Sequence, residues 1–244
     1  MDFPVLIAAV GVLAGAVASV AGFGIGSLLT PLLAVQAGTK LAVAAVSIPH
    51  FLGTAVRCWM LRKDINRQVL LSFGITSAIG GLLGALLHNY FQNPAITLTF
   101  GAILIFAGII GATEWSRNIS FRGWTTWIAG AISGGFGGLV GNQGGIRSAA
   151  LLTFDLEPAP FVATATAIGI FVDAARMPVY FLADASQLAS IWTTIATASV
   201  AVIAGTFVGT LLLKKVDKEL FKRLVSAVIL VLGVYMLRTG LGAR

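Results

Sequence analysis

Four charged residues stand within apolar stretches of this sequence. They are Arg57, Arg147, Asp173 and Arg176. If these stretches span a membrane, each charge costs at least about 2.5 kcal/mol at depth, so it is expected to face a cavity or a partner. Guanidinium groups hold oxyanions through paired hydrogen bonds. The three arginines therefore indicate a site for a small anion.

Arg147 follows Gly144 and Gly145 at the start of an apolar run. Glycine lets a backbone leave the helix and approach a ligand closely, and the free amides and positive dipole end of a new helix favour an anion. We therefore assign these three residues to the substrate site. The alternative is that Arg147 pairs with Asp155 or Glu157 at the other end of its short helix, about 12 Å away.

The glycine break before Arg147 has an earlier copy. Residues 22–33 and 141–152 share a layout in which glycines interrupt an apolar run, at an offset of 119 residues. Non-helical backbone inside a bilayer survives only where protein or a cavity covers it, and two breaks in corresponding places point to a binding site. The first copy contributes Gly24 and Gly26 to the predicted site, and the second adds Asn142, Gln143 and Ser148.

Arg57 and Arg176 occupy matching places in the two halves and are also assigned to the substrate site. The alternative for Arg57 is that it extends to the lipid headgroups. Asp173 lies three residues before Arg176, so it either neutralises this arginine as an ion pair or titrates as a proton-coupling group. His50 is expected to be packed. Hydroxyls at Ser47, Thr164 and Thr166 either contact the substrate or bond to their own helix.

The composition indicates that these residues belong to a membrane protein. Hydrophobic residues make up 57% of the 244 residues and charged ones 10%, with a mean hydropathy of +0.95, far from the values of soluble domains. Stretches such as 66–87, 94–113 and 185–213 are long enough to span, and the alternating pattern of a barrel is absent. We predict an all-α polytopic membrane protein, with residues 1–244 as one integral membrane domain.

Other classes of protein are not supported. The chain has a single cysteine, Cys58, so no disulfide within the chain is expected. Its two histidines have no carboxylate at the spacing of a metal ligand, so no metal or cofactor site is expected. No nucleophile and base can be named for an enzyme. A phosphate-binding loop for ATP is also missing, so transport would draw on a gradient or another chain.

The distribution of positive charge predicts the topology. Basic clusters in short loops mark the cytoplasmic side. If each glycine-broken segment is a hairpin that enters and returns on one face, ten loop and terminal basic residues share that side and three do not; a single crossing would divide them seven to six. We therefore predict hairpins, with connections near 88–93 and 183–187 facing outward. The ten are Arg62, Lys63, Arg67, Arg117, Arg122, Lys214, Lys215, Lys218, Lys222 and Arg223; the three are Lys40, Arg238 and Arg244.

An internal repeat supports this topology. Residues 15–57 and 134–176 are identical at nine of 43 positions, against roughly three or four expected by chance. We predict repeat 1 over 4–113 and repeat 2 over 124–240, each a glycine-broken hairpin plus three transmembrane helices. An odd number of crossings in each half makes the two repeats inverted. The corresponding pairs Gly80 with Gly84 and Gly205 with Gly209 are expected to let helices pack closely.

The glycine-rich turn of residues 22–33, with its proline and two leucines, and its copy at 141–152 resemble the TauE/SafE family of sulfite and organosulfonate transporters. The likeness covers most of the chain, although the first copy is looser than the adjacent glycines typical of the family. The resemblance implies an exporter of sulfite, sulfoacetate or a related organosulfonate. The residues by themselves indicate an anion transporter, with an anion channel or a proton-coupled permease for another small anion as alternatives.

The expected partners follow from these assignments. They are a small anionic substrate, the lipid bilayer and a coupling ion, for which a proton is the candidate; a homo-oligomer is an option, and nucleic acid is not expected. The expected location is the bacterial inner membrane, with multiple crossings.

Overall fold

The computed structural model describes residues 2–87, 94–113, 123–140 and 144–242. Every regular element within these ranges is helical, as the composition predicts. The helices are α1 (Phe3–Ala21), α2 (Ile25–Leu61), α3 (Arg67–Val69), α4 (Ile75–Leu87), α5 (Pro94–Ala112), α6 (Trp124–Val140), α7 (Gly144–Leu151), α8 (Pro158–Ser190), α9 (Trp192–Leu213) and α10 (Lys218–Gly242). Single turns of 3₁₀-helix, η1 (Arg62–Asp64) and η4 (Leu152–Phe154), follow α2 and α7, and a π-helical turn, η2 (Leu70–Gly74), joins α3 to α4.

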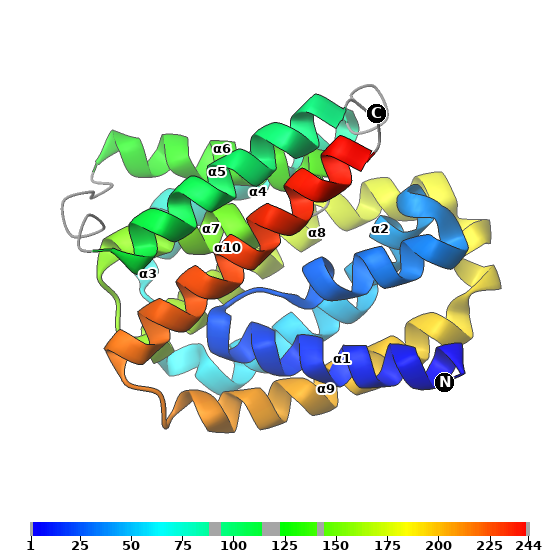
Figure 1. Cartoon of the computed structure of the whole chain (residues 1–244), viewed down its shortest axis with the longest axis horizontal. Coiled ribbons are helices and arrows are strands. Elements are labelled where there is room, and N and C mark those ends of the chain that lie inside the picture. Colours follow the sequence, from blue (N-terminus) through cyan, green and yellow to red (C-terminus); the bar gives the residue numbers. More distant parts are fainter. Residues whose placement is uncertain (1, 88–93, 114–122, 141–143, 243–244) are drawn as a thin grey trace.

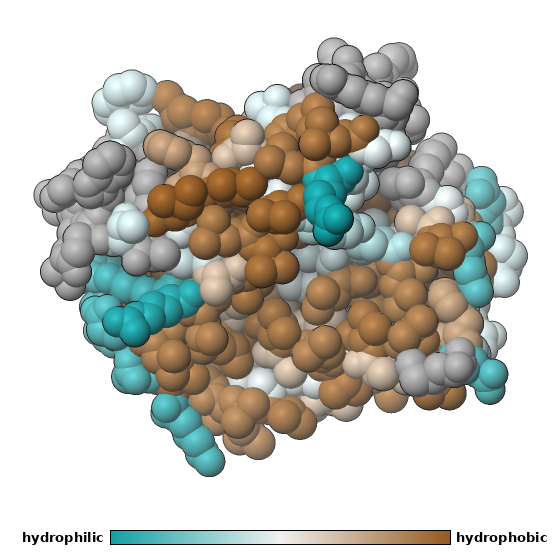
Figure 2. Space-filling view, viewed as in Figure 1, coloured by the Kyte–Doolittle hydropathy of each residue, from teal (hydrophilic) through white to brown (hydrophobic). Residues whose placement is uncertain are grey.

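Six stretches among the described residues are long and apolar enough to cross a bilayer. Apolar residues cover most of the middle of the face shown in Figure 2, where one hydrophilic residue stands out near the upper centre, and the other hydrophilic residues gather toward its two ends. A broad apolar band between polar ends is expected of a surface that contacts lipid. The protein is therefore a polytopic α-helical membrane protein. The six stretches are Phe3–Ala21, Leu41–Asp64, Arg67–Leu87, Pro158–Leu182, Trp192–Leu213 and Lys218–Gly242.

The first glycine break reverses the direction of the chain (Figure 1). α1 ends at Gly22 with a φ of 81°, and Gly24 has a φ of 140°, a conformation that side chains rarely adopt. α2 then begins at Ile25, and at Gly38, where φ is 75°, it turns again before the long span that starts at Leu41. α1 and the first part of α2 thus form a helical hairpin.

The hairpin of α1 and α2 and the helical pair of α6 and α7, called the second hairpin below, have their unconnected helix ends at opposite ends of the molecule. Phe3, at the start of α1, and Gln36, before the turn in α2, line one surface pocket. Trp127, in the first turn of α6, and Phe154, just after α7, line another. Figure 1 places the starts of α1 and α6 at opposite ends. An inverted repeat predicts this arrangement; the repeats themselves, at 4–113 and 124–240, stay predictions.

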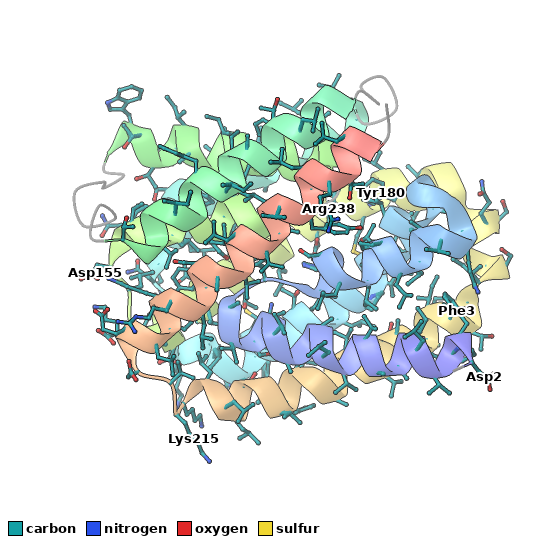
Figure 3. The ribbon with its side chains drawn as sticks, in the orientation of Figure 1. Asp2, Phe3, Asp155, Tyr180, Lys215 and Arg238 are labelled. Atoms are coloured by element: carbon teal, nitrogen blue, oxygen red, sulfur yellow. The ribbon has the colours of Figure 1, made fainter. Side chains whose placement is uncertain are left out.

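Two of the predicted basic clusters lie at the same end. α3, which begins at Arg67, is at the left in Figure 1, and Lys215 is at the left in Figure 3, opposite Asp2 at the N-terminal end of α1. The hairpin arrangement predicts this grouping, whereas a single crossing at the first break would separate the two clusters. Arg117 and Arg122 of the third cluster lie outside the described residues.

One predicted connection is wrong. Residues 183–187, expected to form an outer loop, belong to α8, which continues to Ser190. The turn falls at Ile191, so the predicted span 185–213 begins only at Trp192. The stretch from 179 to 191 contains no glycine or proline, so nothing in the backbone stops the helix earlier. Ile191 still lies at the end that carries the start of α1.

Glycines set the close packing of the scaffold helices. A methyl group on Gly205 of α9 would overlap the carbonyl oxygen of Val12 in α1, and one on Gly80 of α4 would overlap that of Ala131 in α6. The second glycine of each pair repeats this contact one turn further on. Val12 and Ala131 are 119 residues apart, the offset of the sequence repeat. The predicted packing role of these glycines is confirmed.

Candidate anion-binding site

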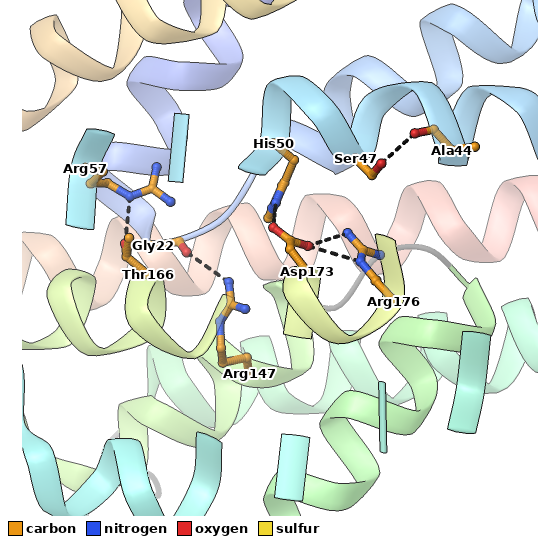
Figure 4. Close-up of polar contacts among 9 residues, drawn as sticks. All are labelled: Gly22, Ala44, Ser47, His50, Arg57, Arg147, Thr166, Asp173 and Arg176. Carbon is orange, nitrogen blue, oxygen red and sulfur yellow. Dashed lines mark hydrogen bonds and ion pairs between the residues drawn. The ribbon is translucent and has the colours of Figure 1, made fainter. Parts of the chain in front are cut away.

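α2 and α8 face each other through polar residues in the interior of the molecule (Figure 4). Spacings of three and four residues place each set on one side of its helix. The two sets match at the repeat offset of 119 residues. On α2 the set is Ser47, His50, Thr54 and Arg57, and on α8 it is Thr166, Gly169, Asp173 and Arg176; all are buried.

Arg147 enters this region from α7. Its side chain is only 2% exposed, and its Nη1 would lie 3.2 Å from a methyl group added at Gly169, next to Thr54. The missing side chain at Gly169 therefore makes room for the guanidinium. Arg147 Nη2 donates a hydrogen bond to the carbonyl oxygen of Gly22 over 3.4 Å, which is long for such a bond. Arg147 thus reaches from the second glycine break to the first.

Several donors beside Arg147 are unsatisfied. Within the described part of the chain, Nε and Nη1 of Arg147, Nη1 of Arg57 and the hydroxyls of Ser148 and Thr54 are buried without a hydrogen-bond partner. A buried group left unpaired costs about 1–3 kcal/mol, and more when it is charged. The unmet donors of two buried cations, with Thr54 next to one of them, are suited to a ligand that is negatively charged and rich in acceptor atoms.

Arg57 turns into the protein instead of reaching for the headgroups. It is 1% exposed, and its Nε donates to Thr166 Oγ1 over 2.7 Å. Its charge and that of Arg147 are close enough to repel each other. The alternative that Arg57 extends to the membrane surface is therefore wrong, and a second cation lies beside Arg147.

The acidic residues after α7 do not pair with Arg147. Asp155 accepts a hydrogen bond from Lys222 over 2.9 Å, and Glu157 accepts one from Lys218 over 2.9 Å. The Lys222 hydrogen bond and the lysine charges hold the pKa of the Asp155 carboxyl below its usual value. These pairs tie the second hairpin to the start of α10 and leave Arg147 in the interior.

Arg176 forms an ion pair with Asp173, which is one of the two possibilities that the sequence left open. Its Nη2 and Nε lie 2.9 and 3.0 Å from Asp173 Oδ1, and its guanidinium carbon is 5.8 Å from the centre of the Tyr180 ring. The other carboxylate oxygen, Oδ2, is 2.6 Å from Nδ1 of His50. Arg176 is therefore bound to Asp173 through two of its nitrogens, while its Nη1 has no partner among the described residues, and His50 is hydrogen-bonded as well as packed.

The two glycine breaks touch each other. A methyl group on Gly144 would overlap the side chain of Phe23, which lies between Gly22 and Gly24. Gly26 is half-buried in the first turn of α2. Gly145 faces away, toward side chains of α5 and α10, so it packs helices. Asn142 and Gln143 lie outside the described residues.

Three hydroxyl residues differ in their roles. Ser47 donates to Ala44 of its own helix, Thr164 accepts from the backbone of Asn66, and only Thr166 reaches the candidate site, through Arg57. Sequence reasoning missed Thr54 and Gly169 altogether. The available signal was positional, because these two match Asp173 and His50 at the repeat offset.

Comparisons with known proteins agree with the expected class. No curated protein and no solved structure matches the chain. The family described as Sulfite exporter TauE/SafE matches residues 7–236, which include both glycine breaks and all four buried charged residues. Because this match runs from the first helix to the last, the chain belongs to the sulfite exporter TauE/SafE family of membrane transporters.

Proposed function

We propose that the protein is a secondary carrier that exports a small sulfur oxyanion, either sulfite or an organosulfonate such as sulfoacetate, and that the anion binds at Arg147. The observation that supports this site most directly is a buried guanidinium whose Nε and Nη1 have no partner among the described residues. Isolated buried charges are costly. An anion that enters this position supplies the missing partner.

The chemistry of the neighbourhood suits a sulfur oxyanion. Arg57, Arg147 and Arg176 bring three positive charges, and Asp173 brings one negative charge. Two oxygens of a sulfite or sulfonate group can accept both arms of the Arg147 fork. The start of α7 adds the positive end of a helix dipole.

A carrier explains the burial better than a channel does. The guanidinium residues are 1–3% exposed, so an anion reaches them only if the protein opens. Two hairpins that open at opposite ends suit alternating exposure of one site, whereas a selective channel would need a lined pore and normally several subunits. We place the basic end in the bacterial cytoplasm, on the charge bias.

Reconstitution into liposomes tests this proposal. Flux of labelled sulfite, sulfate, thiosulfate, sulfoacetate and chloride is measured for the wild type, for Arg147→Met and for Arg238→Met, which changes an exposed arginine of α10. We expect saturable flux of sulfite or sulfoacetate that Arg147→Met abolishes and Arg238→Met preserves. Unsaturable conductance would favour a channel, and flux of none of the anions would refute the proposal.

A further inference from the structure

We propose that His50 is the proton-binding residue of this carrier and that a proton on its Nε2 moves together with the anion at Arg147. This inference rests on the proposed function, with export driven by the outward concentration gradient of the anion. It assigns the coupling role to His50, where the sequence pointed to Asp173.

The hydrogen bonds of Asp173 identify the group that changes its protonation. One carboxylate oxygen accepts from Arg176 and the other lies 2.6 Å from His50 Nδ1. Accepting on both oxygens is the pattern of an ionised carboxylate. Nδ1 then carries a hydrogen, which leaves the lone pair on Nε2. Within the described residues, no hydrogen bond to Nε2 is found, so this nitrogen is free to take up a proton.

The charges around His50 couple this proton to the anion. α8 contributes Asp173 and Arg176, and α7 contributes Arg147. Arg57 lies two turns further along α2, and α1 and α9, which pack against α2, contain no ionisable residue. A proton on His50 is repelled by the cations and attracted by the carboxylate. An anion at Arg147 offsets the repulsion, so each ligand favours binding of the other, and this linkage is reciprocal.

The sequence repeat shows that the helix crossing does not require this pair. The counterparts of His50 and Asp173 are Gly169 and Thr54; these two are neighbours that carry no charge themselves, and the guanidinium of Arg147 lies against them. The same two helices therefore meet once through an ion pair between their own residues and once around the Arg147 side chain of α7, with no ion pair between α2 and α8. Buried ion pairs contribute little net stability. A functional reason for the His50 pair is therefore more consistent with the structure than a structural one.

Co-transport of a proton with a monoanion moves no net charge, and this property provides the test. Methanesulfonate is a suitable probe because, unlike sulfite, it does not change its own protonation near neutral pH. Purified full-length protein in liposomes is compared as wild type, His50→Asn and His88→Asn, the last changing the only other histidine of the chain. Asparagine keeps a donor for Asp173 but cannot titrate.

The accumulation ratio of methanesulfonate is measured under an imposed potential and, separately, under a pH gradient. In the wild type and in His88→Asn, the accumulation ratio should not change with the potential. It should change tenfold for each unit of pH difference across the membrane. In His50→Asn it should ignore the pH gradient and change about 50-fold per 100 mV, because one charge then moves (about 2.3 kcal/mol). The same response to potential in wild type and His50→Asn would overturn the inference while leaving the carrier intact.

Proton uptake in weakly buffered detergent solution covers the case in which His50→Asn binds but no longer transports. Wild-type protein should take up a proton when methanesulfonate binds, and His50→Asn should bind without uptake. Binding to the wild type without uptake would overturn the inference. Absence of both binding and flux in the wild type would refute the proposed function, and the inference with it.

Discussion

Replacing Arg147 with methionine distinguishes a binding residue from a structural tether. Methionine keeps an unbranched apolar stem and removes the guanidinium. If Arg147 mainly holds the two glycine breaks together through Gly22, the unliganded protein should lose stability. If it belongs to an anion site, the unliganded protein should lose none, because a buried charge that Arg57 repels has been removed.

The two hypotheses predict measurably different stabilities for the unliganded variant. A hydrogen bond from a charged donor contributes about 1.5–3 kcal/mol, and the 3.4 Å bond to Gly22 is at the weak end of that range. Replacing buried charges by apolar groups often stabilises a protein by about 1–4 kcal/mol. We therefore expect the unfolding temperature of unliganded Arg147→Met to stay the same or to rise.

Anion affinity should change in the opposite direction. Truncating one partner of a buried hydrogen-bonded charge pair costs about 2–5 kcal/mol, which corresponds to roughly 30- to 4,000-fold in Kd. Arg147→Lys keeps the charge but loses the fork. Losing one charged hydrogen bond should weaken binding about 10- to 100-fold.

Thermal unfolding of the purified protein, with and without sulfite or sulfoacetate, measures both the stability and the anion binding. A ligand that binds the folded state raises the unfolding temperature. Wild type should be stabilised by the anion and Arg147→Met should not. A less stable unliganded Arg147→Met that still responds to the anion like the wild type would refute the assignment of Arg147 to the site.

Two further predictions concern topology and packing. In a Cys58→Ser background, a membrane-impermeant reagent should label Ala185→Cys in intact cells and not Lys215→Cys. Both residues are exposed; Ala185 precedes Ile191, which lies at the end that carries the start of α1, and Lys215 lies toward the opposite end. Labelling of Lys215→Cys would contradict the hairpin topology. Gly205→Ala should lower the stability by about 1–3 kcal/mol, because its methyl group would overlap the backbone of α1. Gly242→Ala is the control, with nothing within 4 Å, and equal unfolding temperatures for the two variants would contradict the packing role.

Much of the architecture can be predicted from the sequence because its signals are local. Hydropathy identifies helices that cross a bilayer, and the glycines near residues 22–26 and 141–145 indicate where the backbone leaves the helix. The grouping of basic residues predicts hairpins, and at the first glycine break the structure contains one. The end of α8 could not be predicted, since charge in the stretch 183–187 does not stop a helix whose residues from 179 onward include no glycine or proline.

The candidate site depends on contacts that no local signal contains. The repeat offset singles out Arg57 and Arg176 equally, yet one donates to Thr166 and the other pairs with Asp173. His50 meets Asp173 across 123 residues of sequence. Which polar groups meet, and which donors stay unpaired, depends on how α2 and α8 cross and on how far α7 inserts between the helices. Close packing of apolar and glycine surfaces determines that crossing, so only the tertiary structure could decide it.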